Sequence, residues 1–199
     1  DSFNTKKDEE VLVKVGVSAV DIAGARKNVE SEIPEWDFDK VRKDARTAWN
    51  NYLSKIDITT SDKEDKTIFY TALYHTAISP NLFTDADGRY LGMDLEVHQG
   101  DTINPLYTVF SLWDTFRALH PLMTIIDPNL NNQFINSLIR KHQEGGIYPM
   151  WDLASNYTGT MIGYHAVPVI VDAYMKGYRN FDAHEAYKAS LRAAEYDTT

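Results

Sequence analysis

Apolar residues recur every three or four positions over most of the chain, which is the spacing of one face of an α-helix. Asp37, Asp127 and Asp182 stand where helices would begin, and aspartate is a favoured capping residue. Ser61 with Glu64 three residues later matches a capping box. These signals predict helices over about 20–31, 37–56, 61–79, 105–120, 127–145 and 159–176, and a last helix that begins at 182.

A different pattern stands near the start of the chain. The odd positions from Val11 to Val17 are all valine, a period of two that predicts a β-strand with branched residues on one face. A single strand is not stable in water. We therefore expect this segment to pair with, or pack against, structure that belongs to a larger protein.

From residue 35 onward, the predicted helices alternate between exposed and buried and are joined by one short and one long connection per pair. This arrangement is typical of stacked helical hairpins. The expected fold is mainly α: a partial α/α toroid of about three helical hairpins, half of a closed ring, with a short N-terminal β-strand segment.

Composition narrows the class of protein. The 199 residues carry a formal net charge of −9, and the acidic residues are spread along the chain. Nucleic-acid binding needs clustered Lys and Arg, so the charge argues against such a partner. No apolar run approaches the roughly 18 residues of a membrane-spanning helix. The 12 Tyr, 8 Phe and 4 Trp favour a carbohydrate site, because sugar faces pack on flat rings, although core packing explains most single aromatics.

The polar segment 81–104 has no helical period and reads as a long loop or small hairpin. In it, Asp85 and Asp87 precede Gly88, and carboxylates around a glycine turn suit a calcium ion. The bidentate Glu of a twelve-residue calcium loop is absent, so an ordinary Asp-Gly turn is the alternative interpretation. These two residues are weak metal candidates.

The run from Ser111 to Arg117 brings together a ring, a carboxylate and a guanidinium. On a helix, Trp113 and Arg117 share a face and Asp114 lies beside them, so the three can converge on one polar ligand. A carboxylate next to a guanidinium can bind neighbouring sugar hydroxyls. An Asp114–Arg117 pair at a helix end, with the Trp113 ring in the core, is an equally good explanation.

A second polar and aromatic segment, 147–160, contains Trp151, Asp152 and Asn156, and His165 follows it at a predicted helix start. We count these four residues as candidate substrate-binding groups, with a structural role for the histidine as the alternative. The chain has no nucleophile elbow, phosphate-binding glycine loop or His-rich metal motif, so esterase, kinase and zinc-hydrolase functions have no support.

Three long runs resemble the first part of the catalytic domain of glycoside hydrolase family 92, the calcium-dependent exo-α-mannosidases. They are IFYTALYHTAISPNLFTDADGRYLGMD, YTVFSLWDTFRALHPLMTIIDP and MIGYHAVPVIVDAYMKGYRNFDAHEAY. The resemblance implies that 1–34 is the end of a β-sandwich domain with its linker, and that 35–199 begins a six-hairpin toroid. It further implies inverting, calcium-assisted removal of terminal mannose by a periplasmic or extracellular bacterial enzyme.

The same resemblance bears on individual residues. Asp114 and Arg117 fall on a motif expected to contact the terminal mannose, and His165 matches the histidine of a GYHAVP motif. The family's Trp-Glu run appears here as Trp151 and Asp152, a change that puts that loop's role in doubt. The catalytic acid and base are expected outside this chain, as calcium ligands may be.

We therefore expect this chain alone to be inactive and to need the remainder of the same enzyme, with a mannose-containing glycan as ligand. A non-catalytic, carbohydrate-binding helical module is an alternative, and so is a toroid glycosidase that acts on another sugar. The linkage cleaved does not follow from the sequence.

Overall fold

A computed structural model describes residues 4–195. The first residues of the predicted domain 1–34 and the last residues of the predicted domain 35–199 therefore lie outside the described residues. The fold is mainly helical, as predicted. Its helices are α1 (Ile22–Glu32), α2 (Phe38–Leu53), α3 (Lys63–His75), α4 (Leu112–Thr115), α5 (Leu119–Ile126), α6 (Pro128–Gly145), α7 (Ala166–Met175) and α8 (Ala183–Ala194).

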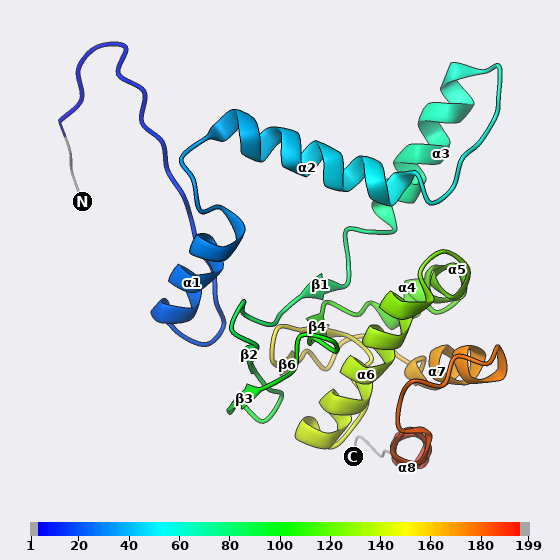
Figure 1. The fold of residues 1–199 in the computed structure, drawn as a ribbon. Helices are drawn as coiled ribbons and strands as arrows, with labels where there is room; N and C mark the ends of the chain where they lie inside the picture. Colours follow the sequence, from blue (N-terminus) through cyan, green and yellow to red (C-terminus); the bar gives the residue numbers. More distant parts are fainter. Residues whose placement is uncertain (1–3, 196–199) are drawn as a thin grey trace.

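Helix α6 is the centre of the packed part of the molecule and contacts α5, α7 and α8 (Figure 1). Its inner face carries Phe134, Ile135 and Leu138, each at most 3% exposed. Asp127 caps its first turn by accepting a hydrogen bond from the Leu130 amide. In Figure 1, α2 and α3 extend away from this group of helices, and α1 lies beyond the short strands.

Three two-stranded antiparallel pairs fill the connections between helices. They are β1 (Asn81–Leu82) with β4 (Tyr107–Thr108), β2 (Arg89–Leu91) with β3 (Val97–Gln99), and β5 (Asp152–Leu153) with β6 (Asn156–Tyr157). The expected hairpin within 81–104 is thus present as β2–β3, in which Tyr90 lies opposite His98. All three pairs lie on the side of α6 that faces α1 (Figure 1).

Several helix boundaries differ from those predicted. Asp62, not Ser61, caps α3, since its carboxylate accepts from the Glu64 amide. The helix expected over 105–120 is wrong: β4 occupies its start, α4 is a single turn, and a break separates α4 from α5. The helix expected from 159 begins only at Ala166.

The strand predicted over residues 11–17 is also wrong for the part of the chain that the structure describes. The segment has no strand assignment, and Val13, Val15 and Val17 are at least 75% exposed. A strand needs the backbone of a neighbour for its hydrogen bonds, and the described strands all pair with one another. The alternating valines therefore favour a strand, but no strand among residues 4–195 pairs with them.

Within residues 4–195, no helix combines the length and the apolar character needed to cross a membrane.

Candidate functional site

The segment from Ser111 to Arg117 forms a short turn whose polar groups face outward. Helix α4 spans only four residues, and Ser111 donates a hydrogen bond of 2.9 Å to Oδ2 of Asp114. Trp113 is 41% exposed, and Asp114 and Arg117 are exposed as well. No ion pair joins Asp114 to a basic residue within the described part of the chain. The alternative of an Asp114–Arg117 pair with a core Trp113 is therefore wrong.

Flat groups lie against one another from this turn to the start of α7. The Arg117 guanidinium lies 5.6 Å from the ring centroid of Trp113 and 5.5 Å from that of Phe116. The Phe116 ring in turn stacks on His165, with centroids 4.3 Å apart and planes 3° from parallel. We call these four residues, Trp113, Arg117, Phe116 and His165, the stacked row. Sequence reasoning missed Phe116, although it lies inside the motif.

His165 ends the stacked row in a restricted environment. Burial, and then the nearby positive charge of Arg117, lowers the pKa of His165 below its ordinary 6.5, so the ring is neutral at neutral pH. Its Nε2 is covered and has no hydrogen-bond partner among residues 4–195. Gly163 has a φ of +86°, and a Cβ there would stand 2.5 Å from Nε2. Glycine is thus required for this close approach.

The second predicted segment lies beside the first. Ser111 and Trp151 form an isolated antiparallel bridge, and the Leu112 amide donates to the Met150 carbonyl at 3.4 Å. At the other end of the β5–β6 hairpin, the Thr158 hydroxyl donates a hydrogen bond of 2.8 Å to the Trp151 carbonyl. Trp151 is half-buried and Asn156 is exposed. The two aromatic and polar segments therefore share one side of the molecule.

Asp152 does not fit its predicted role as a ligand-contacting residue. It is 0% exposed, and its Oδ2 lies 2.9 Å from Nζ of Lys141, which is also 0% exposed. Its two oxygens also accept hydrogen bonds from the Thr108 hydroxyl and from the Phe110 amide. A carboxylate enclosed by two hydrogen-bond donors and a buried ammonium group cannot reach a sugar at the surface. The structure corrects this prediction.

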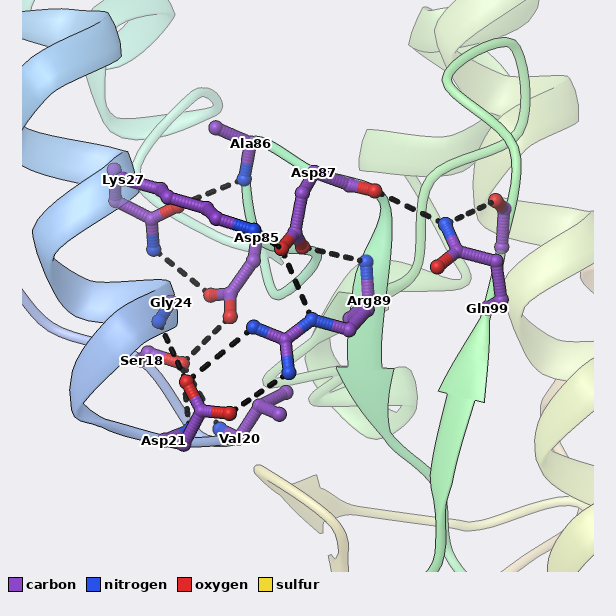
Figure 2. A network of polar contacts seen from close by, with 12 residues as sticks. Ser18, Val20, Asp21, Gly24, Lys27, Asp85, Ala86, Asp87, Arg89 and Gln99 are labelled. Atoms are coloured by element: carbon purple, nitrogen blue, oxygen red, sulfur yellow. Dashed lines mark hydrogen bonds and ion pairs between the residues drawn. The ribbon is translucent and has the colours of Figure 1, made fainter.

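The weak metal candidates are held by donors of the chain itself (Figure 2). Asp85 is 7% exposed and accepts hydrogen bonds from the Ser18 hydroxyl at 2.6 Å and the Asn28 amide at 2.8 Å. Asp87 pairs with Lys27 at 2.8 Å and with Arg89 at 3.0 Å. The hydrogen bond from Lys27 is the main reason why the pKa of Asp87 falls to about 2.

These contacts decide against a calcium ion on Asp85 and Asp87. Calcium takes six to eight oxygen ligands, whereas cationic nitrogens occupy the space beside Asp87. No group of three or more His, Cys, Asp or Glu that could hold a metal lies together within residues 4–195. The network instead joins α1 to the β2–β3 hairpin, with Arg89 also pairing with Asp21 at 2.8 Å (Figure 2).

The sequence model of the glycosyl hydrolase family 92 catalytic domain matches residues 24–199. The chain belongs to glycosyl hydrolase family 92. The match begins within α1, and the predicted domain boundary at residues 34 and 35 stays a prediction. An uncharacterized secreted glycosidase of the fungus Arthroderma benhamiae is 30% identical over an alignment of 193 residues that covers 94% of this chain and 20% of that protein.

Solved structures agree with the family assignment. This family 92 chain superposes on an α-mannosidase of Bacteroides thetaiotaomicron with a TM-score of 0.85 and 36% identity, covering 91% of this chain and 24% of that one. An inverting mannosidase of the same organism gives a TM-score of 0.81 and 34% identity over 87% of this chain and 24% of that one. The predicted fold, a partial α/α toroid, is thereby confirmed. The chain spans about a quarter or less of the length of these relatives.

Proposed function

We propose that this chain is part of an enzyme that removes terminal α-linked mannose from glycans by inverting hydrolysis, and that the stacked row with Asp114 binds the terminal sugar. The observation that carries the proposal is the bridge between Ser111 and Trp151, which brings both aromatic and polar segments to one side. The similarity to α-mannosidases, one of them solved with bound mannoimidazole, supports mannose as the sugar.

The groups of this surface suit a pyranose. The exposed Trp113 ring offers a flat apolar face to the C–H side of a sugar. Asp114 can accept hydrogen bonds from two hydroxyls, and Arg117 can donate to their oxygens. Because His165 is neutral, it adds no second positive charge beside Arg117. Trp151 and Asn156 extend the surface toward the next sugar of the glycan.

Hydrolysis needs more than this surface supplies. An inverting glycosidase uses one carboxylic acid and one carboxylate on opposite sides of the scissile bond, and the proposed surface holds Asp114 alone. We therefore place the acid and base in the remainder of the enzyme, and expect this chain by itself to be inactive. Calcium also stays part of the proposal, with ligands elsewhere, because Asp85 and Asp87 do not fit it. The proposed location is extracellular or periplasmic, and the secreted relative supports the first of these.

Kinetics of the intact enzyme test this proposal. Asp114→Asn and Arg117→Met each remove one charged contact, and we expect kcat/KM for an aryl α-mannoside to fall on the order of 10-fold to 100-fold. Asp39→Asn is the matched control, because Asp39 is exposed on α2, away from the stacked row. Unchanged kcat/KM in both site variants would remove Asp114 and Arg117 from the sugar site.

The substrate profile separates the rival functions. Turnover of the aryl α-mannoside, inhibited by mannose-type but not glucose-type iminosugars, supports the proposal. Glycan binding without turnover by the intact protein would favour a non-catalytic binding module. Preferential hydrolysis of an aryl α-glucoside would point to a glycosidase for another sugar.

A further inference from the structure

The buried Asp152 connects three separate segments of the chain. Its carboxylate lies 2.9 Å from Nζ of Lys141 on α6, accepts the Thr108 hydroxyl from β4 at 2.7 Å, and accepts the Phe110 amide at 3.0 Å. Asp152 itself is the first residue of β5. Because two hydrogen bonds and one close ammonium group hold this carboxylate, it fixes how the segments lie relative to one another.

The contact between Lys141 and Asp152 is an ion pair more than a hydrogen bond. The two atoms are 2.9 Å apart, yet Nζ has no partner with hydrogen-bond geometry among residues 4–195. Charge attraction depends on the distance and little on the angle, so the short separation defines the interaction. Replacing a buried pair with apolar residues is often neutral or stabilising. Fold stability alone is therefore a weak reason for this arrangement.

Backbone strain next to the ion pair points to a positioning role. Val109 has a φ of +65°, a left-handed conformation that a β-branched residue rarely adopts. Strained residues persist where the surroundings determine them and are common at functional sites. Here the unusual turn at Val109 precedes Phe110, whose amide donates to Asp152. The carboxylate thus compensates for a conformation that the chain would otherwise avoid.

The strained turn leads directly into the proposed sugar site. The backbone amide of Phe110 donates to the Asp152 carboxylate, while the backbone of the next residue, Ser111, bridges to that of Trp151. Two neighbouring residues of one segment are therefore attached to two neighbouring residues of the other. Trp113 follows two positions later. The register of the Trp113 turn against the β5–β6 hairpin depends on this pair of attachments.

We infer that Asp152, charge-balanced by Lys141, is a positioning residue that holds the Trp113–Arg117 turn against the β5–β6 hairpin and so sets the shape of the sugar site. That the positioned turn binds a sugar rests on the proposed function, whereas the attachment of this turn to the β5–β6 hairpin through Asp152 is a property of the fold. Asp152 acts through the Phe110 amide and does not touch the ligand.

The test compares two double variants in the intact enzyme, because a single change would leave a buried charge unpaired and impair folding. Lys141→Met with Asp152→Asn removes both charges but keeps an oxygen for the Phe110 amide. Lys141→Met with Asp152→Leu removes the charges and the acceptor. Asp172→Asn, which breaks the partly exposed pair of Asp172 on α7 with Lys176 just beyond it, is the control for loss of an ion pair.

The expected results differ between the variants. Amides of residues 109–114 should exchange at least tenfold faster in the Leu variant than in the Asn variant, with those of α8 unchanged in both. A displacement near 1 Å costs an enzyme on the order of 100-fold, so we expect kcat/KM for an aryl α-mannoside, and the affinity for a mannose-type iminosugar, to be about 10-fold to 100-fold lower in the Leu variant at an equal melting temperature.

Equal amide exchange in the two folded double variants would overturn the inference, and so would equal kcat/KM and iminosugar affinity. If the intact wild-type enzyme does not hydrolyse mannosides but the two double variants still differ in amide exchange, the positioning role of Asp152 is supported and the proposed function is overturned.

Discussion

Acidification from pH 7 to pH 5 should loosen the contact between α5 and α6 through His120. This residue is 1% exposed, its Nδ1 lies 3.3 Å from Oδ1 of Asn131, and its ring meets Phe134 edge to face at 5.9 Å. Burial lowers the pKa of His120 from 6.5 to about 4, more than the contact with Asn131 raises it. At pH 5, His120 is therefore protonated in the unfolded chain but neutral in the folded chain.

The sign and size of the effect follow from this difference. The contribution of His120 to stability is fully present above pH 6.5, declines as the pH falls, and changes no further below about pH 4, where both states are protonated. With these two pKa values, the linkage relation gives a loss of about 2 kcal/mol between pH 7 and pH 5. His120→Phe removes the titrating group and keeps a flat ring against Phe134, so most of this loss should disappear.

Hydrogen exchange of the α5 and α6 amides in the intact enzyme measures the local free energy of opening, after correction for the intrinsic pH dependence of exchange. His184→Phe, at an exposed position on α8, is the matched control and should leave the pH dependence of α5 and α6 as in the wild type. Exchange at the imidazole C2 position follows His120 directly. The reasoning fails if His120→Phe and the wild type lose equal protection, or if the ring titrates near pH 6.5.

Two further predictions concern the network between α1 and the β2–β3 hairpin. Gly24→Ala would place a Cβ 2.3 Å from Oδ2 of Asp85, so we expect about 1–3 kcal/mol of destabilisation, measured as reduced protection of α1 from hydrogen exchange; protection equal to the wild type would refute the crowding. The hydrogen bond from Arg89 lowers the pKa of Asp21 to about 2. The Arg89–Asp21 ion pair should therefore hold α1 to the hairpin above about pH 3.8 and weaken as the pH falls toward 2. Asp21→Asn should speed exchange in α1, less so at high salt, whereas no difference from the wild type at low salt would mean that the pair contributes nothing.

Local signals predicted the elements that local interactions determine. Asp127 and Asp182 each accept a backbone amide at the start of α6 and α8, as their positions in the sequence indicated. Gly146, with a φ of +82°, caps α6 directly after residue 145, the predicted end of this helix. In these helices the caps, the 3.6-residue period and the buried face all favour the same structure, so one sequence window contains the information.

The wrong predictions concern segments whose structure depends on residues far away in the sequence. The period over 105–120 favours a helix, but Thr108 and Phe110 bond to Asp152, which is more than forty positions away in the sequence. The valines at 11–17 favour a strand but find no partner strand among residues 4–195.

The candidate site shows the same limit. Its Trp, Asp and Arg residues were visible in the motif, whereas the bridge from Ser111 to Trp151 and the burial of Asp152 depend on packing. A lysine on the inner face of α6 was the one available sign that a carboxylate would be buried nearby, since buried charges are paired.

The most direct test of the central claim is a crystal structure of the intact enzyme with a mannose-type iminosugar. We expect the inhibitor to pack on the Trp113 ring and to make hydrogen bonds to Asp114 and Arg117, on the side of the molecule where Ser111 meets Trp151. An inhibitor bound with neither Asp114 nor Arg117 in contact would contradict it.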